Sequence, residues 1–153
     1  RFLTLTKGTG VINRIFHGFG KFEGEMDGRK NGALISMSNG KAVAFAIFNL
    51  QARGEMFVTH NDPVYEGMIV GLAPKAGDMI INVMKGKQLT NMRTQGTDEN
   101  VVLTPVRQMS IAEQLSMLNT DEALEITPKS LRLRKAILNP NDRKKNEKSS
   151  TPL

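Results

Sequence analysis

The sequence predicts an α+β domain, built mainly as an antiparallel β-sheet or a small, partly closed barrel, with two or three helices. Short runs rich in β-branched and aliphatic residues alternate with turns that contain glycine or proline, which is typical of strands. Residues 41–53 form an alanine-rich apolar run, and Ser110-Ile-Ala-Glu113 has the spacing of a helix-capping box. Strands and helices mixed in this order favour the α+β class.

The length and composition allow one main hydrophobic core. The chain has 153 residues, 39% of them apolar and none of them cysteine. This excludes disulfides and thiolate chemistry, and no run approaches the roughly 20 apolar residues of a membrane span. We therefore expect a cytoplasmic protein with no membrane partner. Because the sequence starts at Arg1 without a helix cap or lead-in, we also expect it to be the C-terminal piece of a longer protein.

The first third of the chain predicts two strands around a linker. Residues 11–16 predict a strand whose partners lie outside this chain, and residues 21–31 are polar and glycine-rich like a linker. Residues 33–37 predict a second strand, and residues 38–40 a tight turn.

The middle of the chain predicts one helix and several strands. Residues 41–53 fit either a helix or a buried strand, and their alanines, their length and the stop at Gly54 favour the helix. Residues 55–60 and 66–72 predict strands on either side of a turn at 61–63. After a turn at 74–77, we expect residues 78–84 and 100–105 to pair as a hairpin.

The last third predicts two helices around two strands. The capping box predicts a helix over 110–118, with Ile111, Leu115 and Leu118 packed on the sheet. Residues 123–127 and 131–134 alternate like strands, and Asp121, Glu122 and Glu125 are interpreted as solvated carboxylates. Asn139-Pro140 predicts the start of a short helix that carries Arg143, Lys144 and Lys145.

The net charge of +6 is concentrated near the C-terminus. Residues 129–148 hold eight of the 21 bases and two of the 15 acids, which leaves thirteen of each elsewhere. Such a basic block attracts phosphates with little sequence specificity, and Arg143, Lys144 and Lys145 are candidate RNA contacts. The alternative is a solvated tail that only keeps the protein soluble.

The connection over residues 85–99 is the strongest functional indication. Long connections of this kind are usually binding loops or disordered linkers. Gly86 and Gly96 bracket a stretch whose polar and cationic side chains suit a hydroxyl-rich polyanion such as RNA. A flexible hairpin tip is the alternative. The candidate contacts are Lys85, Lys87, Asn91, Arg93, Thr97 and Asp98.

Signatures of catalysis are weak. His17 and His60 lack the spacing of a metal site or a catalytic pair, so no metal is predicted. Lys85-Gly-Lys-Gln88 lacks the upstream glycine and the Ser or Thr of a phosphate loop. We expect this chain to be no enzyme and to bind no cofactor, GTP included.

The sequence resembles the TypA/BipA family of ribosome-associated translational GTPases along nearly its whole length. The segments that carry the resemblance, in order, are residues 31–36, 40–45, 53–54, 64–71, 85–99, 127–128 and 131–135. The resemblance implies that residues 1–22 end a domain like the fifth domain of elongation factor G, with a ferredoxin-like fold. Residues 23–138 would be the family's own C-terminal domain, and residues 139–153 a basic tail.

The resemblance also implies a function. The parent protein would bind the ribosome, hydrolyse GTP with Mg²⁺ through an N-terminal domain, and act in translation, large-subunit assembly and stress adaptation. Residues 85–99 would contact ribosomal RNA and A-site tRNA near the peptidyl-transferase centre, and no DNA. In the alternative, the domain is a scaffold that positions other domains without contacting RNA.

Overall fold

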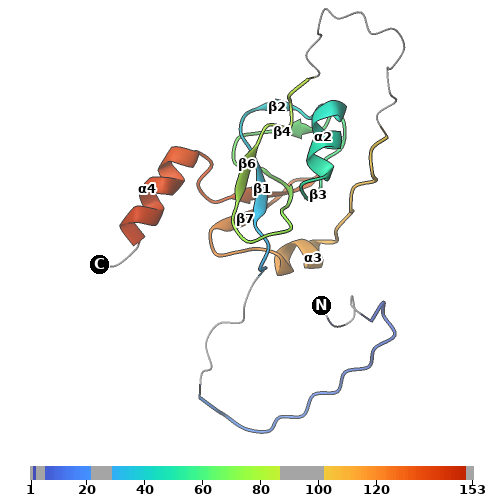
Figure 1. Ribbon diagram of the computed structural model, residues 1–153. Coiled ribbons are helices and arrows are strands. Elements are labelled where there is room, and N and C mark those ends of the chain that lie inside the picture. Colours follow the sequence, from blue (N-terminus) through green and yellow to red (C-terminus); the bar gives the residue numbers. More distant parts are fainter. Residues whose placement is uncertain (1, 3–5, 22–28, 87–101, 151–153) are drawn as a thin grey trace, which may run out of the picture.

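A computed structural model of the protein describes residues 2, 6–21, 29–86 and 102–150. Its centre is a four-stranded sheet of order β3-β5-β1-β6, accompanied by two ribbons of two strands each (Figure 1). The strands are β1 (Ala33–Ser36), β2 (Gly40–Lys41), β3 (Glu55–Met56), β4 (Pro63–Val64), β5 (Ile69–Leu72), β6 (Met79–Ile81), β7 (Glu122–Ile126) and β8 (Leu131–Lys135). The helices are α2 (Ala44–Gln51), α3 (Ile111–Ser116) and α4 (Pro140–Ser150). The α+β class is confirmed, and the described strands form open sheets and no closed barrel.

The central strand β1 is buried on both faces and separates two apolar clusters. Its side chains alternate, so Leu34 joins one cluster while Ala33 and Ile35 join the other. This arrangement makes three layers. Helix α2 covers one face of the sheet, and the β7–β8 ribbon with the residues around α3 covers the other.

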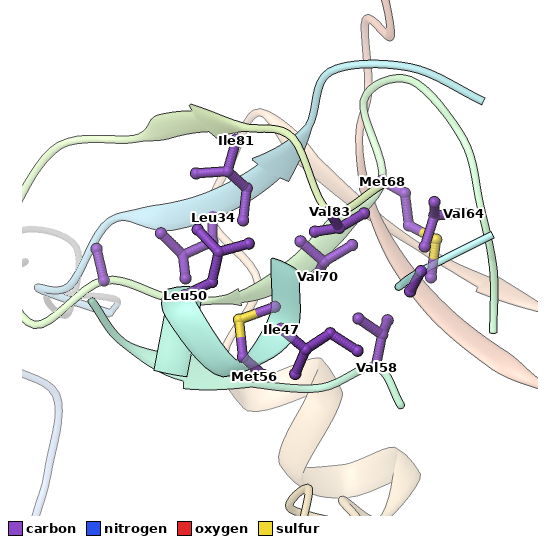
Figure 2. Packing of buried hydrophobic residues seen from close by; sticks show 12 residues of the cluster. Leu34, Ile47, Leu50, Met56, Val58, Val64, Met68, Val70, Ile81 and Val83 are labelled. Carbon is purple, nitrogen blue, oxygen red and sulfur yellow. The ribbon is translucent and has the colours of Figure 1, made fainter. Parts of the chain in front are cut away.

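Helix α2 provides the first layer, which confirms the helical interpretation of residues 41–53. Ile47 and Leu50 point from it toward the sheet, where they meet Leu34 and Val70 (Figure 2). The helix begins at Ala44 and not at residue 41, because Gly40 and Lys41 pair with β4.

The β7–β8 ribbon provides the opposite layer and confirms two predicted strands. Its register places Leu124 opposite Leu133, and both pack against the second cluster. Gly67, just before β5, supports the ribbon by accepting the Lys135 N–H at 2.9 Å. Its φ of +81°, and the Leu138 Cα only 2.7 Å from where a Cβ would stand, make glycine necessary there.

The predicted hairpin of residues 78–84 with 100–105 is wrong in the described part of the chain. Strand β6 pairs in parallel with β1, with Leu34 opposite Met79, and residues 102–105 form no strand. The parallel pairing is favoured because it buries Ile81 and Val83 in the first cluster. The predicted strands at 55–60 and 66–72 are present but shorter, as β3 and β5.

The strand predicted at residues 11–16 is not formed in this chain alone. Residues 9–21 have no regular secondary structure, and Val11, Ile15 and Phe16 are exposed. A single strand without a neighbour leaves its backbone ladder unpaired and gains no burial, so it does not form alone.

The capping box that begins α3 is confirmed. The Ser110 hydroxyl accepts the Glu113 N–H at 3.3 Å, and the Glu113 carboxylate accepts the Ser110 N–H at 2.9 Å. The predicted apolar stripe is only partly right, because Leu118 packs on the second cluster while Ile111 and Leu115 are about half exposed. The helix ends after six residues and turns Gln114 inward, so its apolar stripe is not fully covered. Among the described residues, no helix is long and apolar enough to cross a membrane.

Candidate nucleic-acid interface

The segment predicted to bind RNA leaves the fold beside α2. Val83 accepts the Val43 N–H at 2.9 Å at the start of this helix, and Lys85 is exposed two residues later. At the other end of α2, the Gln51 amide forms a pair of hydrogen bonds with the Thr104 backbone, at 2.8 and 3.1 Å. Val83 and Thr104, which flank the segment, are thus bonded to opposite ends of one helix, roughly 12 Å long. Lys87, Asn91, Arg93, Thr97 and Asp98 lie outside the described residues.

Helix α4 carries the second predicted group of contacts and confirms the predicted terminal helix. Asn139 begins it by accepting the Asn141 N–H at 2.8 Å on its side chain. The described side chains of α4 include none that is buried, and Figure 1 shows the helix projecting away from the sheets. A helix that is polar all round gains little from packing on its own domain, so its lysines are available to an outside partner.

The three predicted cations of α4 differ in their roles. Arg143 donates from Nη1 to the Ile137 and Leu138 carbonyls, at 3.0 and 2.6 Å, and so holds the chain that leads into the helix. Lys145 lies 3.7 Å from Asp142, and both side chains are largely exposed, which makes a weak pair. Lys144 is exposed, with no partner among the described residues. Because α4 stands apart from α2 in Figure 1, the described contacts form two separate groups.

A buried cluster of five charged side chains was missed by the sequence analysis. Lys135 is only 2% exposed, and its Nζ donates to Asp78, Asp121 and Glu122 at 2.5, 2.6 and 3.1 Å. Arg29 donates two hydrogen bonds to the Glu122 carboxylate, from Nη2 to Oε1 at 2.7 Å and from Nη1 to Oε2 at 3.2 Å. We call these five residues the ion cluster. The ion cluster connects three parts of the fold: the residues just before β1, those just before β6, and the β7–β8 ribbon.

The ion cluster corrects two interpretations. Glu122, interpreted as a solvated carboxylate, has a side chain that is 0% exposed, whereas Asp121 keeps more than half of its side chain in solvent. Lys135, counted in the C-terminal basic block, faces three carboxylates and contributes little to the outside field. The alternation of Leu131, Leu133 and Lys135 on one face of β8 already placed this lysine inward, where a charge requires partners.

The ion cluster also changes the protonation of its members. Burial by itself would lower the pKa of Lys135, but hydrogen bonds to Asp121, Asp78 and Glu122 outweigh it and raise that pKa above its usual value. Burial would raise the pKa of Asp78, yet the hydrogen bonds from the Ala33 N–H and Lys135 lower it. The contact between Lys135 and Asp78 is therefore ionic at neutral pH.

Glu125, also interpreted as a solvated carboxylate, accepts a hydrogen bond from the Tyr65 hydroxyl at 2.6 Å. Burial, followed by this bond, raises the pKa of Tyr65 to about 12. The contact fixes the outer face of the β7–β8 ribbon against the turn between β4 and β5.

The two histidines are not brought together with other groups of catalytic type. His60 accepts the Ala44 N–H on Nδ1 at 3.2 Å, which serves the start of α2, and His17 lies in the exposed N-terminal segment. No group of three or more histidines or carboxylates suited to hold a metal ion occurs in the described parts of the chain.

Comparison with known proteins defines the class of this domain. The family model of the TypA/BipA C-terminal domain matches residues 31–140, which include the whole sheet, both ribbons and the start of α4. The chain therefore belongs to the TypA/BipA family.

Individual relatives agree along nearly the whole chain. It is 48% identical over 153 residues to the large ribosomal subunit assembly factor BipA of Buchnera aphidicola (subsp. Schizaphis graminum), covering 99% of this chain and 25% of that protein. It is 46% identical over 145 residues to the proteins of the same name from Salmonella typhimurium and Escherichia coli K12, covering 94% of this chain and 24% of each relative. The chain thus spans about a quarter of the length of these curated relatives.

Proposed function

We propose that this chain is the ribosome- and RNA-binding C-terminal module of a translational GTPase that acts in large-subunit assembly, translation and stress adaptation in the cytoplasm. The observation that carries the proposal is the family relationship, because relatives named as large ribosomal subunit assembly factors match almost every part of the chain. The charge distribution supports it, since the ion cluster uses its cations within the fold while Lys85 and the lysines of α4 face outward.

In this proposal, segment 85–99 makes the specific contacts, which are to ribosomal RNA and A-site tRNA near the peptidyl-transferase centre. Its two anchors on α2 restrict where the segment can reach and reduce the entropy lost on binding. Helix α4 supplies a less specific hold on phosphates. Lys144 and Lys148 are its freest cations, because Arg143 is already bonded to carbonyls and Lys145 is near Asp142.

GTP and Mg²⁺ would be bound by the part of the parent protein that lies outside this chain. Residues 85–88 do not fit a phosphate loop, because they lack its upstream glycine and the Ser or Thr directly after its lysine. No step of GTP hydrolysis is assigned to this domain.

The test is large-subunit binding by the full-length parent with Lys85, Lys87 and Arg93 changed to alanine. Three lost phosphate contacts are expected to weaken binding tenfold or more at physiological salt, about 1.4 kcal/mol or more. The matched control changes Lys21, Lys30 and Lys75, three exposed lysines elsewhere, and is expected to bind within about twofold of the unchanged protein. Equal binding by both triple variants, with unchanged melting temperatures, would refute the loop contact.

The scaffold alternative is supported by a different feature, the incompletely covered apolar side of α3. It predicts that deletion of residues 86–97 leaves ribosome association unchanged, whereas the RNA-binding proposal predicts a clear loss. The two hypotheses are separated by measuring this deletion beside the triple variant.

A further inference from the structure

A groove of the protein lies beside α3. It has a volume of about 820 Å³ and is lined by Phe57, Met109, Ile111, Gln114, Ile126 and Leu131, among others. Ile126 is 64% exposed, Ile111 48%, and Leu115, one turn further along α3, 52%. We call the groove with these three side chains the α3 face. Aliphatic surface of this kind, gathered in one place, is typical of a surface that another polypeptide covers.

A buried and unpartnered acceptor lies in the same groove. Gln114 is only 8% exposed, and its Oε1 has no hydrogen-bond partner among the described residues, while its Nε2 donates to the Met109 carbonyl at 3.3 Å. An unsatisfied buried acceptor destabilises a fold by about 1–3 kcal/mol. A partner that presents an N–H or O–H group beside apolar side chains would satisfy this acceptor.

The path of the chain indicates where this partner comes from. Arg29 donates to the Met117 carbonyl at 3.3 Å and to Glu122, so the polypeptide enters the domain at the C-terminal end of α3. Residues 11–19 precede this point and expose Val11, Ile12, Ile15, Phe16 and Phe19, the last completely. These apolar side chains are not buried by any described part of the chain, so we expect another part of the polypeptide to bury them.

Distance then limits the position of that core. Ten peptide steps separate Phe19 from Arg29, and an extended chain spans at most roughly 35 Å over this length. Whatever buries Phe19 is therefore tethered within that radius of Arg29, which contacts the end of α3. Relatives of this chain are about four times longer, so the missing core has ample polypeptide to form from.

We propose that the α3 face is the docking surface for the part of the parent polypeptide that precedes this chain. Apolar side chains of that part cover Ile111, Leu115 and Ile126, and one of its N–H groups donates to Gln114 Oε1. The docking fixes the orientation of the C-terminal domain, and with it the direction in which segment 85–99 and α4 point. It is independent of whether those elements bind RNA.

The experiment measures thiol reactivity in the full-length parent without ribosomes. Leu115→Cys and Ile126→Cys are single probes on the α3 face, and Lys41→Cys is an exposed control in β2, which lies at the opposite end of the domain from α3 in Figure 1; native cysteines of the parent are first replaced. The rate at which each probe cysteine reacts with a maleimide is divided by the rate of the control cysteine. This ratio is compared between the parent and the 153-residue chain. The ratio is expected to be about tenfold or more lower in the parent, as for a face covered nine-tenths of the time.

Equal ratios in the parent and in the 153-residue chain would overturn the proposal. Protection that appears only when large subunits are added would also overturn it, since the occupant would then be ribosomal. Protection within the 153-residue chain that grows with its concentration would assign the face to a second copy instead. Gln114→Leu in the parent is expected to raise the Leu115→Cys rate about fivefold, the equivalent of one lost hydrogen bond, and an unchanged rate would remove Gln114 from the docking contact.

Discussion

The ion cluster and helix α4 use the same kinds of side chain in opposite ways. In the ion cluster, Lys135 is almost fully buried and meets three carboxylates within 3.1 Å. In α4, Lys145 is 81% exposed and its nearest carboxylate is 3.7 Å away. Only ten residues separate the two lysines. Solvent exposure, and not the count of charges, therefore decides which cations stabilise the fold and which are available to a partner.

The largest expected effect comes from removing the cation of the ion cluster. Lys135→Met leaves three carboxylates close together, two of them at least half buried, and is expected to lower the free energy of unfolding by about 3–5 kcal/mol. Urea unfolding of the 153-residue chain measures this. The matched variant Lys145→Met is expected to change stability by less than about 0.5 kcal/mol. Similar losses in both variants would remove the distinction between the two regions.

Arg29→Lys sharpens the comparison within the ion cluster. It keeps the positive charge but loses the two-pronged contact with Glu122 and the bond to the Met117 carbonyl. We expect a loss of about 1–3 kcal/mol in the free energy of unfolding, less than for Lys135→Met. A negligible loss would show that net charge alone, and not geometry, satisfies Glu122.

The pH dependence of stability provides a third test. Because the pKa of Asp78 is lowered in the fold, its contribution is complete above its unfolded value of 3.8 and is lost as pH falls through the lower folded value. Lys135 and Tyr65 have raised pKa values, so their contributions are complete below 10.5 and 10.0, respectively, and are lost as pH rises further. Urea unfolding over pH 2–12 is expected to show both declines.

Two variants identify the groups responsible for these declines. Asp78→Asn is expected to reduce the loss of stability at acid pH. Tyr65→Phe is expected to reduce the loss between pH 10 and pH 12, because the pKa of Tyr65 is about 12 in the folded protein. If Asp78→Asn leaves the acid limb as steep as before, the ion cluster does not control acid unfolding.

A smaller loss than in the ion cluster is expected at the start of α3. Ser110→Ala removes the side-chain half of the capping box, and we expect a loss of about 1 kcal/mol. Hydrogen exchange is expected to increase at the Glu113 amide while the amides of β1 remain protected. Uniformly faster exchange in β1 would mean that α3 is more tightly coupled to the central sheet than its half-exposed face suggests.

Local signals were predicted well because their causes are local. The capping box at Ser110, the alternation of residues 131–134 and the Asn139-Pro140 start of α4 each depend on neighbouring residues, and all are present in the structure. The run at 41–53 needed more than periodicity, and its alanines and length gave the right answer.

Long-range features were missed because their causes are distant in the sequence. Strand β6 pairs with β1 about 45 residues away, since that pairing buries Ile81, and no local pattern specifies it. The burial of Glu122 depends on Arg29, which is 93 residues away. Of the candidate site, Lys85 and α4 are placed by the structure, while the assignments of Lys87, Asn91, Arg93, Thr97 and Asp98, and the division at residues 22 and 138, stay predictions.

The salt dependence of large-subunit binding tests most directly the claim that outward cations bind RNA while inward cations hold the fold. The measurement compares the full-length parent with its variant Lys144→Ala/Lys145→Ala/Lys148→Ala. Each lost phosphate contact is expected to reduce the slope of log affinity against log salt by about 0.7–0.9, so the loss of three contacts is expected to reduce it by roughly two to three units, with an unchanged melting temperature. An unchanged slope, or a slope that falls only because the domain unfolds, would contradict the account.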